Sequence, residues 1–209
     1  MNIIESLNWR YSVKKMSGKK IPDSKLNLIL ESIRLCPTSL GLQPFNIIII
    51  ENLKIKQKIL PIAYNQKQII QCSHLIIFAF WENNYEKEVD NYINNIKNIR
   101  KVSIESLDKL KNSILFFLKS KNNKEKKIWA KHQTYIALGM ALTTCALEKI
   151  DSTPIEGFNI QKLNKLLKLD KMNLSSSVLL AIGYRDKKND DLAYAKKVRR
   201  NKDDFFINL

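Results

Sequence analysis

Glycine is scarce in this chain. Only five of the 209 residues are glycine, at positions 18, 41, 139, 157 and 183. A Rossmann turn needs Gly-x-Gly-x-x-Gly and a P-loop needs a glycine-rich run, because the backbone must approach the phosphates closely. Neither pattern is present. The sequence therefore excludes dinucleotide binding through a Rossmann turn and phosphoryl transfer on a P-loop.

Histidine and cysteine are equally rare. His74 and His132 lie far apart, and neither has a cysteine or carboxylate at ligand spacing, so we expect no metal site. The absence of a Gly-x-Ser-x-Gly elbow argues against a serine hydrolase. We expect His74 to be a hydrogen-bonded residue at the start of a strand. The cysteines Cys36, Cys72 and Cys145 are too few and too scattered for a disulfide framework, which favours a reducing, cytoplasmic setting.

Long hydrophobic runs are also missing. The longest clean apolar run, Leu75 to Trp81, is seven residues long, whereas a membrane span needs about 20. The N-terminus carries Glu5 and Arg10 with no apolar stretch after them, so we expect neither a secretory signal nor a membrane anchor. Because 44% of the residues are hydrophobic, the chain can build a sizeable core, and we expect one domain over residues 1–209.

Positive charge is abundant, but arginine is not. The formal net charge is +16, and of the 36 cations 30 are Lys and six are Arg. Nucleic-acid sites favour arginine forks and exposed aromatic side chains, and neither is concentrated here. The 28 Ile and 21 Asn residues, like Lys, have AT-rich codons, which suggests a coding bias. A basic nucleic-acid-binding protein without redox activity is thus the alternative that the composition favours less than a solvated lysine surface.

Hydrophobic patterning predicts few strands and many helices. Apolar runs predict strands buried on both faces at 45–51, 75–81 and 176–184. Helical periodicity predicts helices at 3–9, from 22–23 to before Pro37, at 53–71 and at 128–149. In the first helix we expect Ile3, Ile4 and Leu7 to face inward, and in the last we expect Gly139 to allow close packing. A basic helical excursion is expected at about 85–127. The class is α+β, since no regular βαβ alternation occurs.

Three short segments combine residue types that could hold a cofactor. In an extended Arg10–Lys14 segment, Arg10, Ser12 and Lys14 point to one side and form an anion site. In 37–44, small hydroxyl residues and Gly41 would let the backbone approach a flat ligand. In 153–158, Gly157 permits a close approach. Each segment alone could equally be a solvated loop or an ordinary turn.

Six motifs in register make the function more specific. They comprise Arg10, Ser12 and Lys14; Pro37, Thr38, Ser39, Gln43, Pro44 and Phe45; Asn65, Gln66, Gln68, Ser73 and His74; Trp129, His132, Gln133 and Tyr135; Pro154 to Phe158; and Lys197 and Arg199. In this order they resemble the FMN-dependent nitroreductase family, nearest to the oxygen-insensitive NAD(P)H nitroreductases and their quinone- or dihydropteridine-reducing relatives. The resemblance runs from residue 3 to about 200.

The resemblance implies a cofactor site. It implies that Arg10, Ser12, Lys197 and Arg199 hold the FMN phosphate and ribityl chain, with Tyr11 beside them. Lys14 would lie near the N1–C2 edge of the flavin ring and raise its reduction potential. The backbone at Glu156 and Gly157 would contact flavin N5, and Asn65 the pyrimidine edge. The partner subunit would contribute Pro37, Thr38, Ser39 and Gly41.

Some positions depart from the family pattern. Gly41 replaces a common Asn, which removes a side-chain contact to the ribityl chain, and Gln68 stands where relatives carry Lys, near the nicotinamide. Phe45 replaces Trp. For the acceptor pocket the resemblance indicates Leu40, Gln68, Phe116 and Phe117, although the two phenylalanines could equally belong to a helix core.

The resemblance also implies a quaternary structure and a reaction. The fold would be nitroreductase-like, with a mainly antiparallel sheet flanked by helices, in an intertwined homodimer whose C-terminal strands are exchanged. The apolar end, Phe205 to Ile207, would extend the partner's sheet. NADH or NADPH would deliver hydride to FMN, and a quinone or nitroaromatic acceptor would then take two electrons in a ping-pong cycle without a side-chain acid or base. A relative with a different acceptor, dehalogenase-like or flavin-fragmenting, remains an alternative.

Overall fold

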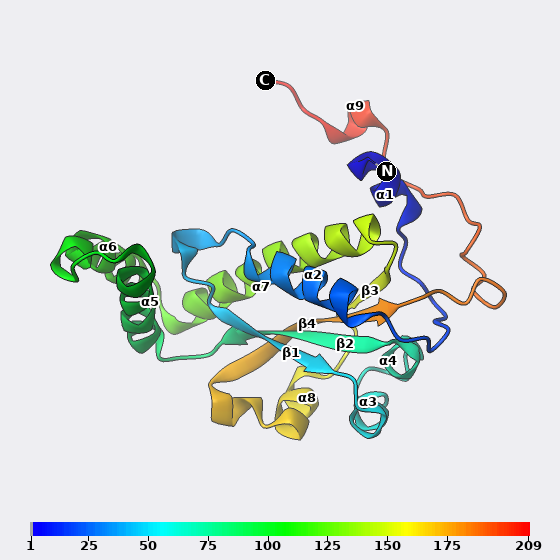
Figure 1. Cartoon of the computed structure of the whole chain (residues 1–209), viewed down its shortest axis with the longest axis horizontal. Coiled ribbons are helices and arrows are strands. Elements are labelled where there is room, and N and C mark those ends of the chain that lie inside the picture. The colour runs from blue at the N-terminus through cyan, green and yellow to red at the C-terminus, as the bar shows by residue number, and fades with distance from the viewer. Residues whose placement is uncertain (1) are drawn as a thin grey trace.

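The computed structural model describes residues 2–209. Helices cover both faces of a four-stranded antiparallel sheet (Figure 1). In chain order the elements are α1 (Ile3–Trp9), α2 (Asp23–Arg34), η1 (Ser39–Gly41), β1 (Phe45–Ile50), α3 (Leu53–Ile59), α4 (Gln68–Gln71), β2 (His74–Trp81), α5 (Tyr85–Arg100), η2 (Glu105–Leu107), α6 (Asp108–Lys119), α7 (Asn123–Leu147), β3 (Asp151–Ile155), α8 (Ile160–Leu167), η3 (Leu169–Met172), β4 (Leu174–Gly183) and α9 (Lys202–Phe205).

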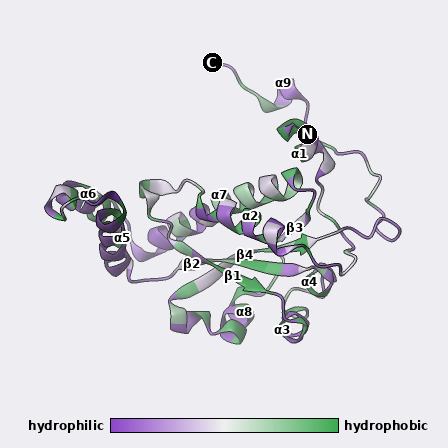
Figure 2. Ribbon diagram, in the orientation of Figure 1, coloured by the Kyte–Doolittle hydropathy of each residue, from purple (hydrophilic) through white to green (hydrophobic). Residues whose placement is uncertain are grey.

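The sheet has the order β1-β2-β4-β3, and every neighbouring pair is antiparallel. The two central strands, β2 and β4, are buried along almost their whole length. Successive side chains point to opposite faces. Ile76 and Phe78 therefore pack beneath α2 and α7, whereas Leu75 and Ile77 pack against α3, α4 and α8. Figure 2 shows the hydrophobic strands between these more polar helices.

The expected strand at 45–51 is present, but its predicted burial on both faces is wrong. β1 lies at the edge of the sheet and pairs only with β2. Ile49 is 42% exposed and Asn46 faces solvent, so the run of isoleucines is only half-buried. Hydrophobicity alone does not distinguish an edge strand from a central one, because strand order is set by tertiary pairing.

β3 is a strand that the sequence pattern did not predict. Pro154 lies within it and pairs in register with Leu180. Proline cannot donate a ladder hydrogen bond and is tolerated at a sheet edge. β3 is such an edge, paired only with β4. The segment at 153–158 is therefore a strand end followed by a turn.

The expected helices are present, some with different limits, and α8 and α9 were not predicted. The stretch 53–71 divides into α3 and α4, and α7 begins at Asn123 rather than at 128. A capping box explains this earlier start, since the Asn122 side chain accepts from the Glu125 N–H and the Glu125 side chain accepts from the Asn122 N–H. The excursion therefore ends before α7. Its helices α5 and α6 enclose a hydrophobic cluster of their own.

Two expectations about apolar faces are wrong for the single chain. Ile3, Ile4 and Leu7 of α1 are 51%, 63% and 37% exposed. Gly139 has no atom within 4 Å of the position of a Cβ, so it makes no close contact. Further along the same helix, Ile136 and Met140 are also exposed. These surfaces resemble helix faces that lack a partner.

The C-terminal tail leaves the body of the molecule. After β4 the chain runs past α1 to the single turn of α9, and it ends away from the sheet (Figure 1). Phe205, Phe206 and Ile207 are 57%, 62% and 86% exposed. None of the helices within residues 2–209 combines the length and apolar composition that a bilayer crossing requires.

Candidate functional site

The predicted anion-binding residues come together in one pocket. A cavity of about 520 Å³ lies between the Arg10–Lys14 segment and the returning tail. Arg10, Tyr11, Ser12, Lys14, Lys197 and Arg199 line it, together with Arg185. Val13 points the other way and is fully buried. The alternation expected from the sequence is thus present, except that Tyr11 also lines the cavity.

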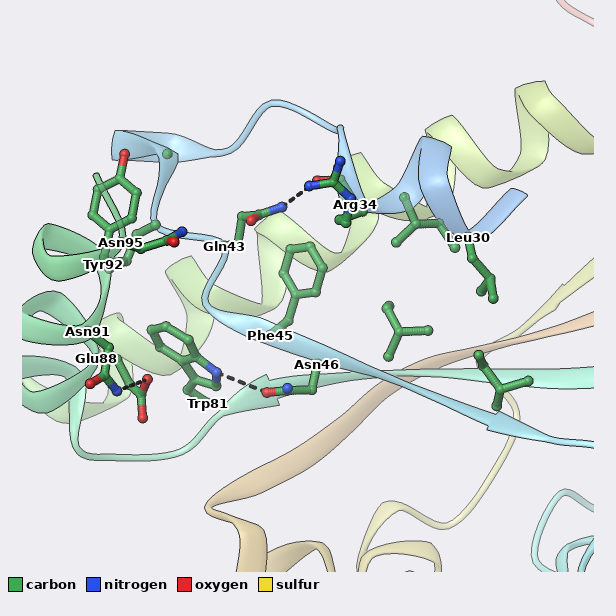
Figure 3. Close-up of a pocket in the computed structure, with 15 residues that line it drawn as sticks. Leu30, Arg34, Gln43, Phe45, Asn46, Trp81, Glu88, Asn91, Tyr92 and Asn95 are labelled. Atoms are coloured by element: carbon green, nitrogen blue, oxygen red, sulfur yellow. Dashed lines mark hydrogen bonds between the residues drawn. The ribbon is translucent and has the colours of Figure 1, made fainter. Parts of the chain in front are cut away.

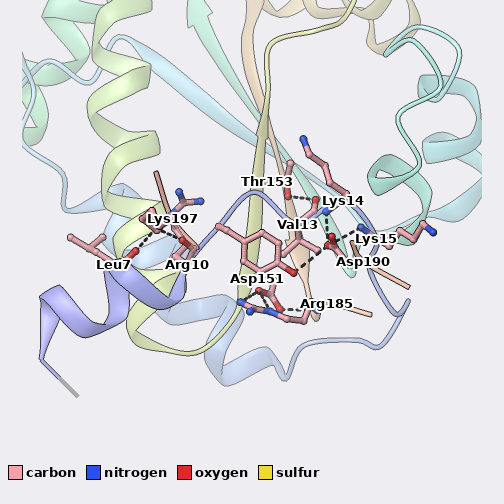
Figure 4. Close-up of polar contacts among 11 residues, drawn as sticks. Leu7, Arg10, Val13, Lys14, Lys15, Asp151, Thr153, Arg185, Asp190 and Lys197 are labelled. Carbon is pink, nitrogen blue, oxygen red and sulfur yellow. Dashed lines mark hydrogen bonds and ion pairs between the residues drawn. The ribbon is translucent and has the colours of Figure 1, made fainter. Parts of the chain in front are cut away.

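Hydrogen bonds from three elements hold the backbone of this segment (Figure 4). The Val13 carbonyl accepts from Thr153 Oγ1 at 2.8 Å and from Gln68 Nε2 at 3.3 Å. Asp190, which is 3% exposed, accepts from the Lys14 N–H at 2.8 Å and from the Tyr11 hydroxyl at 3.2 Å. The segment is therefore rigidly placed before any ligand arrives.

Gln68 has a different position from the one expected. Its side chain is 7% exposed and donates to the Val13 carbonyl. In the single chain Gln68 holds the backbone of the Arg10–Lys14 segment, and its amide nitrogen is already engaged in this hydrogen bond.

An arginine stack forms the wall of the pocket. Arg185 donates to Asp151 through Nε at 2.8 Å and through Nη2 at 2.5 Å. Its guanidinium carbon lies 4.2 Å from the Trp9 ring centroid and 4.5 Å from that of Tyr11. A guanidinium that is both paired and stacked is firmly fixed. Burial is the main reason why the pKa of Tyr11 is raised to about 12.

The remaining cations lack a negative partner. Lys197 Nζ donates to the carbonyl oxygens of Leu7 and Arg10, and no carboxylate within residues 2–209 pairs with Arg10, Lys197 or Arg199. Arg10 Nη1 is buried without a hydrogen-bond partner. Burial, reinforced by neighbouring Arg199, lowers the pKa of Arg10; burial, reinforced by Arg10 and Arg199, lowers that of Lys197.

This arrangement fits a phosphate. A buried donor without a partner costs about 1–3 kcal/mol, and a clustered set of cations adds repulsion. A phosphate group would supply both the acceptors and the negative charge. The residues present thus fit a phosphate-bearing cofactor such as FMN. No group of three or more His, Cys, Asp or Glu side chains that could hold a metal occurs within residues 2–209.

Glu156 and Gly157 follow the end of β3. Gln66 Nε2 donates to the Gly157 carbonyl at 2.8 Å, and the Tyr135 hydroxyl donates to the Glu156 carboxylate. The peptide N–H groups of Glu156 and Gly157 make no hydrogen bond to any described residue. A held backbone with free donors suits contact with an acceptor atom of a ligand. Burial, together with Glu156, raises the pKa of Tyr135 to about 12.

Asn65 lies beside this turn. It has a left-handed backbone, with φ of 58°, and it follows Tyr64 with φ of 50°. The Gln66 contact and the packing of Tyr64 against Gly157 bring the 64–66 turn next to Glu156 and Gly157. Two of the predicted segments, far apart in the sequence, are therefore adjacent.

The loop from Pro37 to Gly41 is not part of this cluster in the single chain. It lies at the C-terminal end of α2, beside the excursion, whereas the Arg10–Lys14 segment lies near α1 at the other end of the molecule (Figure 1). Ser39 N–H donates to Gln133 Oε1 at 2.8 Å, and Leu40 has φ of 61° and packs against the excursion. The two sets can line one site only between two chains.

The predicted acceptor residues on α6 diverge. Phe117 packs edge-on against Trp129, with ring centroids 5.5 Å apart, and belongs to the core of the excursion. Phe116 is 77% exposed. Neither can reach the Arg10 pocket of its own chain. Their role above a flavin thus depends on a second subunit.

A larger cavity of about 610 Å³ runs along the open edge of β1 (Figure 3). Arg34 and Gln43 border it at one end, Tyr92 and Asn95 at the other, and the apolar side chains of β1 form its floor. An open strand edge beside an apolar groove is a template for a further strand.

Sequence reasoning missed two residues of the site, Asp190 and Arg185. Asp190 and Arg185 lie in the charged tail, where nothing in the pattern distinguishes them from solvated residues. Only the return of the tail across the Arg10–Lys14 segment gives them partners. Gln66 was noted as part of a motif, but its contact with Gly157 depends on the turn at 64–66.

Comparisons with known proteins agree with this geometry. The model of the nitroreductase family matches residues 7–184. The chain is 34% identical, over 97% of its length and 94% of the relative's, to a Staphylococcus saprophyticus protein assigned as an NAD(P)H nitroreductase. It is 33% identical to the major NAD(P)H-flavin oxidoreductase of Aliivibrio fischeri, over 95% of this chain and 94% of that protein.

Solved structures share the fold at lower identity. A protein from Exiguobacterium sibiricum, assigned as a nitroreductase and solved in complex with FMN, aligns with a TM-score of 0.86 at 19% identity, over 100% of this chain and 98% of that one. A nitroreductase family protein from Streptococcus pneumoniae aligns with a TM-score of 0.83 at 16% identity, over the full length of both chains. The nitroreductase-like fold expected from the sequence is confirmed, and the chain belongs to the nitroreductase family.

Proposed function

We propose that this protein is an FMN-dependent NAD(P)H oxidoreductase that passes two electrons to a quinone or a nitroaromatic compound. The observation that carries this proposal is the cation pocket, in which Arg10 Nη1 is buried without a hydrogen-bond partner and Lys197 and Arg199 line the same cavity. The free N–H groups at Glu156 and Gly157 provide a second, separate set of donors. The related flavin oxidoreductase of Aliivibrio fischeri supports the same reaction class.

Each set of residues has a distinct task in this proposal. Arg10, Ser12, Lys197 and Arg199 bind the phosphate and the ribityl chain. Lys14 places a positive charge beside the ring, where it stabilises added negative charge. The donors at Glu156 and Gly157 fix the ring at N5. FMN, when bound, supplies acceptance and release of hydride, and the protein orients both reactants and excludes water.

The proposed cycle is ping-pong, with NADH or NADPH and the acceptor using the same space in turn. Hydride transfer itself requires no side-chain acid or base, and the proposal assigns none. A flat stacking surface accepts many aromatic rings, which favours planar quinones and nitroaromatics over non-planar substrates. A family member with a different acceptor is the alternative within this fold. The cytoplasmic location expected from the scattered cysteines stays a prediction.

We further propose that the working form is a homodimer with two shared sites. The Arg10 pocket of one chain would meet the Pro37–Gly41 loop of the other. Three surfaces support this: the exposed apolar residues of α1 and α7, the open edge of β1, and the exposed apolar tail. We expect the C-terminal tail to add as a further strand to the partner's sheet. It would lie along the outer edge of β1, which has no neighbouring strand in the single chain.

The visible absorption spectrum of the purified protein tests the cofactor first. We expect a flavin spectrum that bleaches when NADH or NADPH is added without oxygen. Addition of a quinone should restore the colour, and initial rates at several quinone concentrations should give parallel double-reciprocal lines. Colourless protein that takes up no added FMN, but binds nucleic acid with a steep salt dependence, would contradict the proposal and favour the basic binding protein.

A further inference from the structure

Gly41 and Tyr92 compete for the same space. Gly41 lies in η1 with φ of 68°, a left-handed backbone that favours glycine. A Cβ built on Gly41 would lie 2.5 Å from the Tyr92 hydroxyl oxygen and 3.4 Å from Tyr92 Cζ. The first distance is too short for any real contact. The hydroxyl of Tyr92, on α5, thus occupies the place where a side chain at position 41 would begin.

The Tyr92 hydroxyl has no use inside the single chain. Figure 3 shows the ring extending from α5, with its oxygen toward the loop that precedes β1. No described residue forms a hydrogen bond with it. Tyr85, about two helical turns earlier on α5, differs in this respect, because its hydroxyl donates to the Trp81 carbonyl at 2.7 Å. A hydroxyl placed without a protein partner is available to a ligand.

The surrounding loop has a similar character. Three of its backbone N–H groups are engaged, since Gly41 N–H donates to the Thr38 carbonyl at 2.9 Å, Gln43 N–H to Thr38 Oγ1 at 3.1 Å and Ser39 N–H to Gln133 Oε1 at 2.8 Å. Ser39 Oγ, by contrast, has no hydrogen-bond partner among the described residues. Two hydroxyls without a hydrogen-bond partner among the described residues therefore lie at this loop: Ser39 Oγ from the loop itself and Tyr92 Oη from α5.

We infer that Tyr92 is a flavin-binding residue: its hydroxyl stands in for a side chain at position 41 and hydrogen-bonds the ribityl chain of FMN held in the partner subunit's cation pocket. The inference rests on the proposed function, which brings the Pro37–Gly41 loop to that pocket. The ribityl chain matches the chemistry, because it carries hydroxyls that both donate and accept. An aromatic residue of the excursion would then take over a contact that this loop cannot make.

A double-mutant cycle tests the inference on the full-length dimer. The variants are Tyr92→Phe, Gly41→Asn and the two combined, with Tyr85→Phe as the control that removes a hydroxyl from the same helix. FMN is removed from each protein and added back, and the dissociation constant is measured from the quenching of FMN fluorescence. Size-exclusion chromatography ensures that all variants are compared in the same oligomeric state, and thermal unfolding of the apoprotein reports folding.

We expect Tyr92→Phe to weaken FMN binding about fivefold, which corresponds to one neutral hydrogen bond, with an unchanged melting temperature. Gly41→Asn alone should weaken binding about tenfold, because its Cβ meets the Tyr92 oxygen. In the double variant the Tyr92 oxygen is gone, and Asn tolerates the positive φ at position 41. The Asn side chain can then make the hydrogen bond to the ribityl chain, so FMN affinity should return to within about twofold of the wild type. Tyr85→Phe should lower the melting temperature and leave FMN affinity unchanged.

Two results would overturn the inference. One is a Tyr92→Phe protein with wild-type FMN affinity, and the other is a double variant that binds no better than Gly41→Asn. Wild-type protein that takes up no FMN at all would overturn the proposed function together with this inference, and it is distinguishable because it is seen before any variant is made.

Discussion

The two ends of this molecule carry predicted cofactor residues of opposite character. Around Arg10 the backbone is fixed by Asp190 and Thr153, but three cations lack a negative partner and one buried donor is unpaired. Around Gly41 the N–H groups of Ser39, Gly41 and Gln43 are engaged, and the hydroxyls of Ser39 and Tyr92 have no hydrogen-bond partner among the described residues. The first end is suited to a charged ligand, the second to a neutral one.

This difference suggests how one site could be divided between two chains. The charged end would supply most of the binding energy, because charge-assisted hydrogen bonds are about twice as strong as neutral ones. The neutral end would adjust the fit and would depend on the dimer. The predictions below separate these contributions, beginning with the largest.

Arg10→Met should have the greatest effect. It removes a half-buried guanidinium, whose buried Nη1 lacks a partner and lines the pocket of the proposed phosphate, and we expect the FMN dissociation constant to rise at least about a hundredfold. Arg100→Met, at the exposed end of α5, is the matched control and should leave it unchanged. Fluorescence quenching of added FMN measures both. Equal affinities in the two variants would mean that the phosphate does not bind in this pocket.

Removal of residues 202–209 should separate the two ends. This truncation deletes Phe205, Phe206 and Ile207, which are exposed in the single chain and have apolar surface to bury. We expect the dimer dissociation constant to rise about tenfold to a hundredfold, with FMN affinity falling at protein concentrations where monomers appear. Light scattering after size-exclusion chromatography gives the mass. Ile160→Ser, an exposed apolar residue of α8 on the face of the sheet opposite α2 and α7, should not alter dimerisation.

Asp190→Asn should weaken the charged end without unfolding it. Burial alone would raise the pKa of this carboxyl, but hydrogen bonds from Lys14, Leu192, Lys15 and Tyr11 outweigh burial and lower it. The amide keeps the shape and loses the charge, so we expect FMN binding to weaken about tenfold through displacement of the Arg10–Lys14 segment. Asp191→Asn, an exposed neighbour in the same tail, is the control. Unchanged affinity in Asp190→Asn would show that the segment holds its place without this carboxylate.

Protonation of His74, a residue outside both ends, should have the smallest effect, and that effect is on thermal stability. Burial lowers its pKa, so the unfolded chain takes up a proton near pH 6.5 while the folded chain resists it. Stability is therefore lost as the pH falls through about 6.5, and we expect the melting temperature to drop by about 2–4 °C between pH 7.5 and 5.5 on account of this residue.

The control for this pH effect is the second histidine. His74→Asn can keep the hydrogen bond to Ser73 and should abolish that part of the drop, whereas His132→Asn, on an exposed site, should retain it. A wild-type melting temperature that does not change over this range would contradict the expectation.

Several features could be predicted because they depend on local pattern. The strand β2 and the helix α2 follow from apolar spacing. The His74 side chain forms a hydrogen bond with the Ser73 hydroxyl at the start of β2, as expected. The start of α7 was missed although Asn122 and Glu125 form a capping signature, because the lysines after them obscured the helical pattern.

The rest could not be read from local pattern, because it depends on which segments meet. The isoleucines of β1 have the same hydrophobicity whether the strand is central or at an edge. Pro154 argues against a strand until the sheet places it at an edge. Asp190 and Arg185 gain their roles only when the tail returns across the Arg10–Lys14 segment.

By itself the sequence determined the class of the fold, its family and the residue types of the cofactor site, since these follow from spacing along the chain. The tertiary structure decided which polar groups are left unsatisfied and where. Burial removes water from Arg10 and leaves it without a partner, and the approach of α5 puts the Tyr92 hydroxyl in the space beside Gly41. Both depend on contacts between distant segments, which no local pattern of residues contains.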